Sequence, residues 1–284
     1  YRLKEASDRF KAVDELPNCP GHGGATSDYL KALRGKAIED VKIMFNAKGG
    51  AIMTSMTASI VLFDIIEAII ECVPGTNIVT TELEHPCVFD SCEIYAKKFG
   101  KELRVAKTNP KTGSIEVEEI VNLIDKNTCL ASVIMTSNIT GAVLDIESIV
   151  HECRKKNSEV YIVCDSVQHT PHGAFDLKKC PVDAVGFAAY KFGGVRGLGI
   201  GWFSERAATL PHRRLIKERV DNWEMGGCAP GHYAQLSAIV DYVCWIGSKF
   251  ISSNNRTFLL DGQCIFYLMI SKEMSSCPYP LFLP

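Results

Sequence analysis

Lys191 is the residue of this chain whose position best suits covalent chemistry. It ends the apolar run Val185-Gly-Phe-Ala-Ala-Tyr-Lys and directly precedes a glycine-rich stretch. An ammonium at the end of a buried strand loses hydration, so it is costly unless it is paired or used covalently. One interpretation is a lysine whose stem packs while its amine reaches water, and the other is an amine that forms a Schiff base. Taken alone, Lys191 favours the first interpretation, so its neighbours must decide.

Two strand-to-helix connections carry residues suited to binding an anion or moving a proton. The first, Thr54-Ser-Met-Thr-Ala-Ser59, enters a helix through small hydroxyl residues. Hydroxyls and amides at a helix start suit a phosphate, although for this segment taken alone ordinary N-capping is the favoured interpretation. The second, Glu82-Leu-Glu-His85-Pro, places His85 before a proline that fits the first turn of a helix. His85 is a candidate general base, metal ligand or stacking ring, and the alternative is a solvated loop histidine.

Two further strand ends carry polar groups. Thr136-Ser-Asn-Ile-Thr-Gly141 offers Asn138 as a donor and acceptor, although such residues also form ordinary turns. Asp165 ends the apolar run Val160 to Asp165, where a carboxylate needs a partner. A protonated heteroaromatic nitrogen would be one, and Gln168 adds an amide nearby.

Other ligand patterns are weaker. His169 and His172 have HxxH spacing, but no set of acidic or cysteine ligands accompanies them, so we expect no metal site. The glycines between Gly193 and Gly201 are not followed by the Lys-Ser/Thr of a phosphate-binding loop, and they do not follow a first strand. A nicotinamide-dependent dehydrogenase is therefore not expected.

The order of the expected strands and helices indicates that these segments lie at one edge of a sheet. Apolar strand-like runs alternate with helix-like runs, which indicates an α/β fold with helices covering a largely parallel sheet. The carboxyl ends of parallel strands share one edge, where such folds bind ligands. We expect a large domain over residues 1–235 and a partial small α+β domain over 236–284. Strands are expected at 51–55, 77–81, 102–106, 130–136, 160–165, 182–189 and 198–203, and helices at 57–72, 86–99, 117–124, 146–156 and 231–246.

Composition and charge limit the kinds of partner and location that we expect for this protein. With 31 Lys+Arg against 33 Asp+Glu and no long basic run, nucleic acid is not expected. The apolar stretch 58–73 is interrupted by three acidic residues on one helical face, which favours an amphipathic helix over a membrane span. The first five residues lack the apolar segment of a signal peptide, so a cytoplasmic location is expected. The 12 cysteines are scattered without paired spacing, which indicates mostly reduced thiols.

Taken together and in this order, the segments resemble the class V aminotransferase family of fold-type I pyridoxal-phosphate enzymes. The family includes cysteine desulfurases, selenocysteine lyases and isopenicillin N epimerase. The resemblance covers roughly residues 20–275 and implies a three-layer αβα large domain. Its most specific parts are the Glu-His85 segment, Ser137-Asn-Ile-Thr-Gly141, Asp165-Ser-Val-Gln168 and Tyr190-Lys191.

The resemblance assigns a role to each segment. Lys191 would hold pyridoxal phosphate as a Schiff base and shuttle protons, and Asp165 would pair with the pyridinium nitrogen. His85 would stack on the ring, Gln168 would bind its phenolic oxygen, and Asn138 would lie near the substrate carboxylate. The phosphate would be held by the chain around Ser55, Thr57 and Ala58 and by Tyr190, while Cys228, in Glu224-Met-Gly-Gly-Cys-Ala-Pro, would reach the phosphate site of a neighbouring subunit. A homodimer with its active site at the interface follows.

Several positions depart from the family pattern. The usual glycine and threonine of the phosphate loop are Met56 and Ala58, the usual histidine before the lysine is Tyr190, a common serine is Ala188, and Cys228 replaces threonine. A phenol can still donate to a phosphate. Phosphate binding therefore depends on backbone amides, on Thr57 and on Tyr190.

The resemblance leads to a function hypothesis with alternatives. We expect a pyridoxal-phosphate enzyme that acts on a small amino acid, foremost as a cysteine desulfurase-like carbon–sulfur lyase. An aminotransferase or an epimerase is the alternative within the class. A catalytically silent homologue that keeps the fold for dimerisation or binding is the alternative from another class, because the phosphate loop is altered. None of the cysteines can be assigned as a nucleophile from the sequence, nor can any arginine be assigned to the substrate carboxylate.

Overall fold

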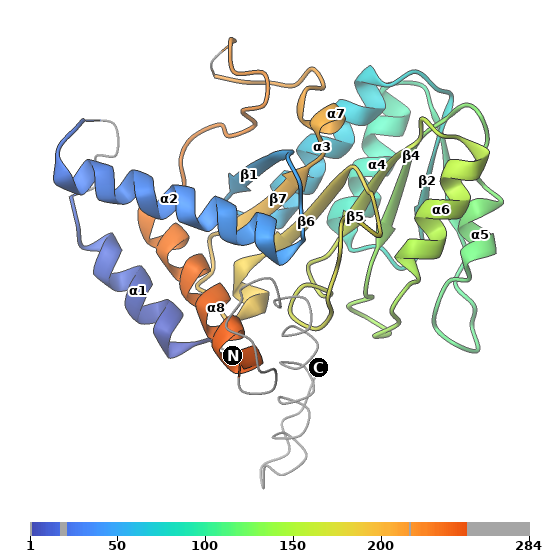
Figure 1. The fold of residues 1–284 in the computed structure, drawn as a ribbon. Helices are drawn as coiled ribbons and strands as arrows, with labels where there is room; N and C mark the ends of the chain where they lie inside the picture. The colour runs from blue at the N-terminus through green and yellow to red at the C-terminus, as the bar shows by residue number, and fades with distance from the viewer. Residues whose placement is uncertain (1, 18–21, 216, 249–284) are drawn as a thin grey trace, which may run out of the picture.

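A seven-stranded mixed sheet forms the centre of the molecule (Figure 1). The computed structural model describes residues 2–17, 22–215 and 217–248. The strand order is β1-β7-β6-β5-β4-β2-β3. The strands are β1 (Ala51–Ser55), β2 (Asn77–Thr81), β3 (Glu102–Ala106), β4 (Thr128–Ile134), β5 (Tyr161–Asp165), β6 (Ala184–Ala188) and β7 (Gly199–Phe203).

Only β7 opposes the direction of the other strands. The pairs β2–β3, β2–β4, β4–β5 and β5–β6 are parallel, whereas β7 is antiparallel to both of its neighbours, β6 and β1. Strand β1 therefore runs with the parallel strands, and its carboxyl end lies at the same edge as theirs. Because Ser55 and Ala188 both pair with Gly199, the chain leaves β1 and β6 on either side of the start of β7.

Helices cover both faces of the sheet. Apolar side chains of α3, α4 and α7 pack on one face, and those of α2, α5, α6 and α8 pack on the other. Helices α1 and α2 lie against α8, beside the sheet (Figure 1). The helices are α1 (Lys4–Asp14), α2 (Ala25–Met44), α3 (Ala58–Cys72), α4 (Pro86–Lys98), α5 (Val117–Val121), α6 (Ile146–Lys156), α7 (Glu205–Ala208) and α8 (Pro230–Ser248), with a 3₁₀ turn, η1, at Ala189–Phe192.

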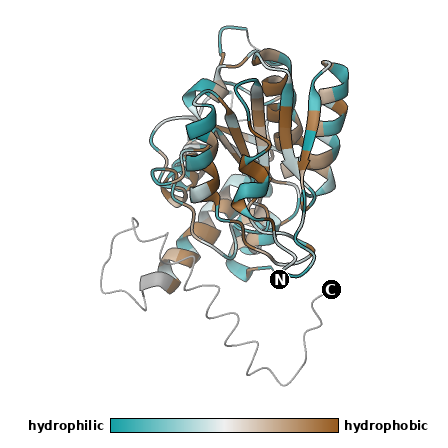
Figure 2. Cartoon of the chain, turned by 90° about the vertical axis from the view of Figure 1, so that its right-hand side faces the viewer, coloured by the Kyte–Doolittle hydropathy of each residue, from teal (hydrophilic) through white to brown (hydrophobic). Residues whose placement is uncertain are grey.

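Buried strands and small residues explain how closely α3 approaches the sheet. Strands β2, β4, β6 and β7 are buried along their whole length, as expected for a sheet covered on both faces. A Cβ atom on Gly186 would lie 2.8 Å from Leu62, and one on Gly201 would lie 2.4 Å from Val61. The two glycines thus let α3 pack directly on β6 and β7. Figure 2 shows the most apolar residues gathered on the central strands.

The α/β fold with a mostly parallel sheet is confirmed, and the expected strands and helices are present. Helix α5 ends at Val121, earlier than the sequence indicates. Helix α1 was not expected; it buries Ala6 and Val13. The domain boundary at residue 235 stays a prediction, since residues 249–284 lie outside the described part of the chain, although α8 runs across it. No helix in the described ranges is both long and apolar enough to cross a membrane.

Candidate active site

A cavity of about 390 Å³ opens at the carboxyl edge of the sheet. It is bordered by the start of α3, the start of α4, the end of β5 and the turn that follows β6. These elements are far apart in sequence, and the parallel topology brings their ends together. Five of the residues expected from the sequence line the cavity: Thr57, Ala58, His85, Asp165 and Tyr190.

Asp165 supplies the negative charge of the cavity. Its side chain is 3% exposed and stands at the last position of β5, where it pairs in register with Gly186 on β6 and Ile134 on β4. Burial raises the pKa of the carboxyl to about 6, while the backbone N–H of Val167, which donates to Oδ1 at 2.9 Å, and the nearby His85 act in the opposite direction. Asp165 is thus a desolvated carboxylate that a cation in the cavity would stabilise.

His85 is the N-cap of α4. Its Nδ1 accepts the backbone N–H of Cys87 at 3.1 Å, and Pro86 occupies the first helical position. Because Nδ1 accepts that bond, we assign the hydrogen of the neutral ring to Nε2. The Cys87 thiol lies 3.0 Å from the same Nδ1, and burial raises its pKa to about 12. The imidazole is therefore tied to the helix start through Nδ1.

The start of α3 lines the cavity with Thr57, Ala58 and Ser59, and the first N–H groups of a helix have no acceptor within the helix. Thr57 caps the helix through Oγ1, which accepts the N–H of Ile60 at 3.2 Å, and the first turn contains no acidic side chain. Strand β7 passes very close to this start, since a Cβ atom on Gly199 would lie 2.0 Å from the carbonyl carbon of Thr57 and 2.2 Å from the nitrogen of Ala58. Helix starts of this kind bind phosphate.

Two cations flank Tyr190. The guanidinium carbon of Arg196 lies 4.5 Å from the centre of its ring, and the amine of Lys191 lies 5.6 Å from it. Tyr190 and Arg196 line the cavity, whereas Lys191 is exposed and is not among the lining residues. The amine that the sequence singles out therefore lies next to the cavity and not inside it.

Four other expected residues lie outside this cavity: Ser55, Asn138, Gln168 and Cys228. Ser55 is half-buried at the end of β1, Gln168 is half-buried after β5, and Asn138 is exposed in the loop after β4. His169 bonds through Nδ1 to the Thr136 hydroxyl at 2.9 Å, and its Nε2 lies 3.3 Å from the Ala174 carbonyl oxygen. Among the described residues, no group of three or more His, Cys, Asp or Glu side chains is placed to hold a metal ion.

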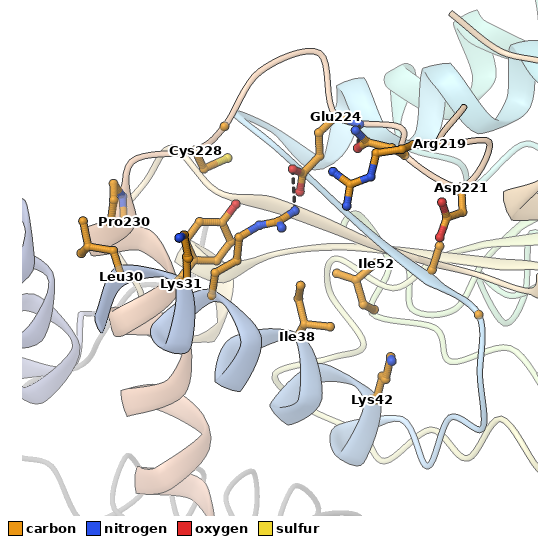
Figure 3. A pocket seen from close by; sticks show the side chains of 16 residues that line it. Leu30, Lys31, Ile38, Lys42, Ile52, Arg219, Asp221, Glu224, Cys228 and Pro230 are labelled. Carbon is orange, nitrogen blue, oxygen red and sulfur yellow. Dashed lines mark hydrogen bonds and ion pairs between the residues drawn. The ribbon is translucent and has the colours of Figure 1, made fainter. Parts of the chain in front are cut away.

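Cys228 lines a second and larger cavity, of about 560 Å³, between α2 and the segment that precedes α8 (Figure 3). There Arg34 of α2 pairs with Glu224 at 2.7 Å, and Thr54 donates to the same carboxylate at 2.5 Å. These bonds fix the segment that carries Cys228. Of these two cavities, the smaller one is lined by both a buried carboxylate at the strand ends and a helix start, so the active site is assigned to it.

Sequence reasoning missed Cys87 and Arg196, which line the cavity beside the expected residues. Cys87 follows the N-cap histidine by two positions, a spacing that places it in the first turn of the helix, so the capping pattern was an available signal. Arg196 lies within the glycine-rich stretch, which the sequence presents only as a backbone feature.

Burial raises the pKa of the thiol at eight cysteines: Cys72, Cys87, Cys92, Cys129, Cys153, Cys164, Cys180 and Cys228. Three others, Cys19, Cys264 and Cys277, lie outside the described residues.

Comparison with known proteins identifies relatives of this chain. Parts of the chain match curated cysteine desulfurases named IscS: 36% identity over 126 residues with that of Buchnera aphidicola subsp. Acyrthosiphon pisum (strain 5A), and 28% over 140 residues with that of Plasmodium falciparum (isolate 3D7). These alignments cover 44% and 49% of this chain, but only 30% and 25% of the two relatives. The matched region is thus less than a third of the length of these relatives.

Solved structures share the fold. A NIFS-like protein superposes with a TM-score of 0.75 at 22% identity, over 88% of this chain and 72% of that one. The apo cysteine desulfurase of Thermococcus onnurineus NA1 gives 0.76 at 18% identity, over 88% and 66%. The model of the family described as aminotransferase class-V matches residues 25–227, which include the sheet and the lining of the cavity. The resemblance seen in the sequence is confirmed, and the chain belongs to the class-V aminotransferase family.

Proposed function

We propose that this protein is a pyridoxal-phosphate-dependent carbon–sulfur lyase that acts on a small amino acid, with L-cysteine as its substrate. The observation that carries the proposal is Asp165, a buried carboxylate at the end of β5 whose pKa is raised to about 6 by burial and whose cavity has no other described carboxylate lining it. Membership of the family and the cysteine desulfurases among its relatives support the reaction type.

The residues present fit a pyridoxal phosphate. Asp165 would accept the N–H of a protonated pyridine nitrogen, which compensates the desolvation of both groups. The first amides of α3, with Thr57 and Tyr190, would hold the phosphate, and Gly199 lets the strand and the helix start meet at that point. His85 would offer the face of its ring. When bound, this cofactor supplies an electron sink for negative charge at the α-carbon of an amino acid.

Lys191 is the proposed covalent anchor and proton carrier. Its exposed side chain follows Tyr190, which lines the cavity, so rotation about the side-chain bonds is the movement that would bring the amine toward the cavity. Asp165 would keep the ring nitrogen protonated, and Lys191 would move a proton to or from the substrate carbon. Asn138 is still the proposed contact of the substrate carboxylate, and Gln168 that of the phenolic oxygen of the cofactor. Both contacts require the loops that carry these residues to move.

The reaction is tested by products. The purified chain is loaded with pyridoxal phosphate, passed through gel filtration and given L-cysteine together with dithiothreitol. We expect alanine and sulfide in equal amounts, with the dithiol supplying the two electrons that reduce the released sulfur atom to sulfide. Formation of 3-mercaptopyruvate without sulfide would identify an aminotransferase, because transamination leaves the carbon–sulfur bond intact, and D-cysteine would identify an epimerase. Lys191→Ala is the control and should yield neither product. Absence of all products from a protein that retains the cofactor would contradict the proposal.

A silent homologue is the second candidate, because two observations favour it. Lys191 lies outside the cavity, and the phosphate loop carries Met56, which is 71% exposed, where the family pattern has glycine. If the chain fails to retain any cofactor absorption after gel filtration while remaining folded, this second function replaces the first.

We also propose a homodimer in the cytoplasm. Cys228 lies outside the cavity of its own subunit, which agrees with a role beside the phosphate of a neighbour, and Met225 of the same segment is 49% exposed. The cytoplasm is supported by the free thiols of eight cysteines: Cys72, Cys87, Cys92, Cys129, Cys153, Cys164, Cys180 and Cys228.

A further inference from the structure

A second carboxyl, Glu84, is buried beneath the proposed site. It is 5% exposed and directly precedes His85 in the sequence. Its Oε1 accepts two hydrogen bonds, one at 2.6 Å from the backbone N–H of Ile134 and one at 2.8 Å from the hydroxyl of Thr81. Ile134 is the last residue of β4 and pairs in register with Asp165. Glu84 therefore joins the end of β2 to the strand beside Asp165.

The other oxygen of Glu84 lies in the interior of the protein. Among the described residues, Oε2 is buried and has no hydrogen-bond partner, as are the hydroxyls of Thr80 and Ser132 on the neighbouring strands β2 and β4. The groups that act electrostatically on Glu84, or on which it acts, are the Asp165 carboxylate and the thiols of Cys87, Cys92 and Cys164. None of these is a cation, so nothing in this set compensates a negative charge on Glu84.

An ionised carboxylate in such a place costs several kcal/mol, which proteins avoid by keeping the acid neutral. Burial, then the negative charge of Asp165, raise the pKa of Glu84 well above its usual range. A neutral acid keeps Oε1 as an acceptor for Ile134 and Thr81, and it gives the buried Oε2 a hydrogen to donate.

From this arrangement we infer that Glu84 is a protonated positioning residue, which as a neutral acid joins the ends of β2 and β4 and so fixes His85 relative to Asp165. Asp165 then remains the single ionised carboxylate beneath the cavity. The protonation of Glu84 is independent of the proposed function, whereas its consequence for cofactor binding rests on that function.

The protonation is tested by infrared difference spectroscopy of the protein without added cofactor at pH 7. We expect the carbonyl stretch of a protonated carboxylic acid, shifted by deuterium exchange, absent from Glu84→Gln and retained in Asp165→Asn. Absence of the band from the wild-type protein, or its persistence in Glu84→Gln, would overturn the inference. This measurement decides the point even if the chain binds no pyridoxal phosphate.

The positioning role is tested by comparing two variants. Glutamine imitates a neutral acid, so Glu84→Gln should bind pyridoxal phosphate as the wild type does. Glu84→Ala leaves the Ile134 N–H without its acceptor and should bind roughly tenfold more weakly, the loss expected for one buried hydrogen bond. The ring signals of His85 in nuclear magnetic resonance spectra without cofactor should shift in Glu84→Ala and not in Glu84→Gln. Weak binding by a folded Glu84→Gln, or unchanged signals and affinity in Glu84→Ala, would contradict the role.

Discussion

The buried carboxylate of Asp165 lowers the stability of the protein, although the site needs its charge to bind a cation. Its pKa is about 6 in the folded protein and 3.8 in its ordinary state, so the unfolded chain loses this proton first as the pH rises. The free energy of unfolding therefore falls between about pH 4 and pH 6 and stays lower above that range. The difference amounts to roughly 3 kcal/mol at neutral pH. A cationic ring nitrogen in the cavity would recover part of this cost.

Replacing Asp165 by asparagine removes that penalty. We expect Asp165→Asn without cofactor to be more stable than the wild type at pH 8 and of similar stability at pH 3.5, because both side chains are then neutral. Binding of pyridoxal phosphate should weaken strongly at the same time. Urea unfolding at the two pH values measures the first effect. Equal stability at pH 8 would show that the carboxylate is not destabilised by its surroundings.

The chemistry of single residues was readable from the sequence where a residue ends a strand. Asp165 and His85 were found because a carboxylate after an apolar run and a histidine before a proline are unusual, and both line the cavity. The position of Lys191 outside the cavity was not readable, since a side-chain rotamer depends on packing. Glu84 was also missed, because only the fold shows that it is fully buried beside β4.

At the scale of elements, the contact between β7 and the start of α3 is the tightest feature of the site. A Cβ atom at Gly199 would meet backbone atoms of Thr57 and Ala58, which cannot move aside without shifting the helix start. The position requires glycine because any side chain would collide with this backbone, and not because the chain has to be flexible there.

We expect Gly199→Ala to lower the free energy of unfolding by roughly 1–3 kcal/mol, the usual cost of overpacking, and to weaken binding of pyridoxal phosphate. Gly35→Ala is the matched control: Gly35 lies inside α2 with nothing within 4 Å of an added Cβ, so alanine should stabilise the helix slightly. Denaturant unfolding and cofactor titration measure both variants. A Gly199→Ala protein with normal stability and affinity would mean that α3 does not need this close approach.

Elements with a clear hydrophobic period were predicted from the sequence, and their packing partners were not. Strands β5 and β6 appear as apolar runs, and α3 appears through its spaced acidic residues. Helix α1 gives a weaker signal because only Ala6 and Val13 are buried, and its burial depends on α8, more than two hundred residues away in the chain. Long-range contacts of this kind leave no local pattern.

At the scale of the whole molecule, an exposed apolar residue beside the site supports the proposed dimer. Ile60, in the first turn of α3, is 39% exposed; Ile94, in the second half of α4, is 50% exposed and serves as the control. If a second subunit covers the active-site edge, Ile60→Lys should shift the protein toward monomer, whereas Ile94→Lys should not. Sedimentation velocity measures both. A wild-type protein that stays monomeric at high concentration, or equal behaviour of the two variants, would contradict the dimer.

The central claim is that this cavity holds pyridoxal phosphate and that Lys191 is its covalent anchor. The most direct measurement is borohydride reduction of the cofactor-loaded protein, followed by peptide mass mapping. We expect one pyridoxyl group per chain on Lys191, lost in Lys191→Ala and strongly reduced in Asp165→Asn. A label on another lysine, or no label on folded protein, would contradict it.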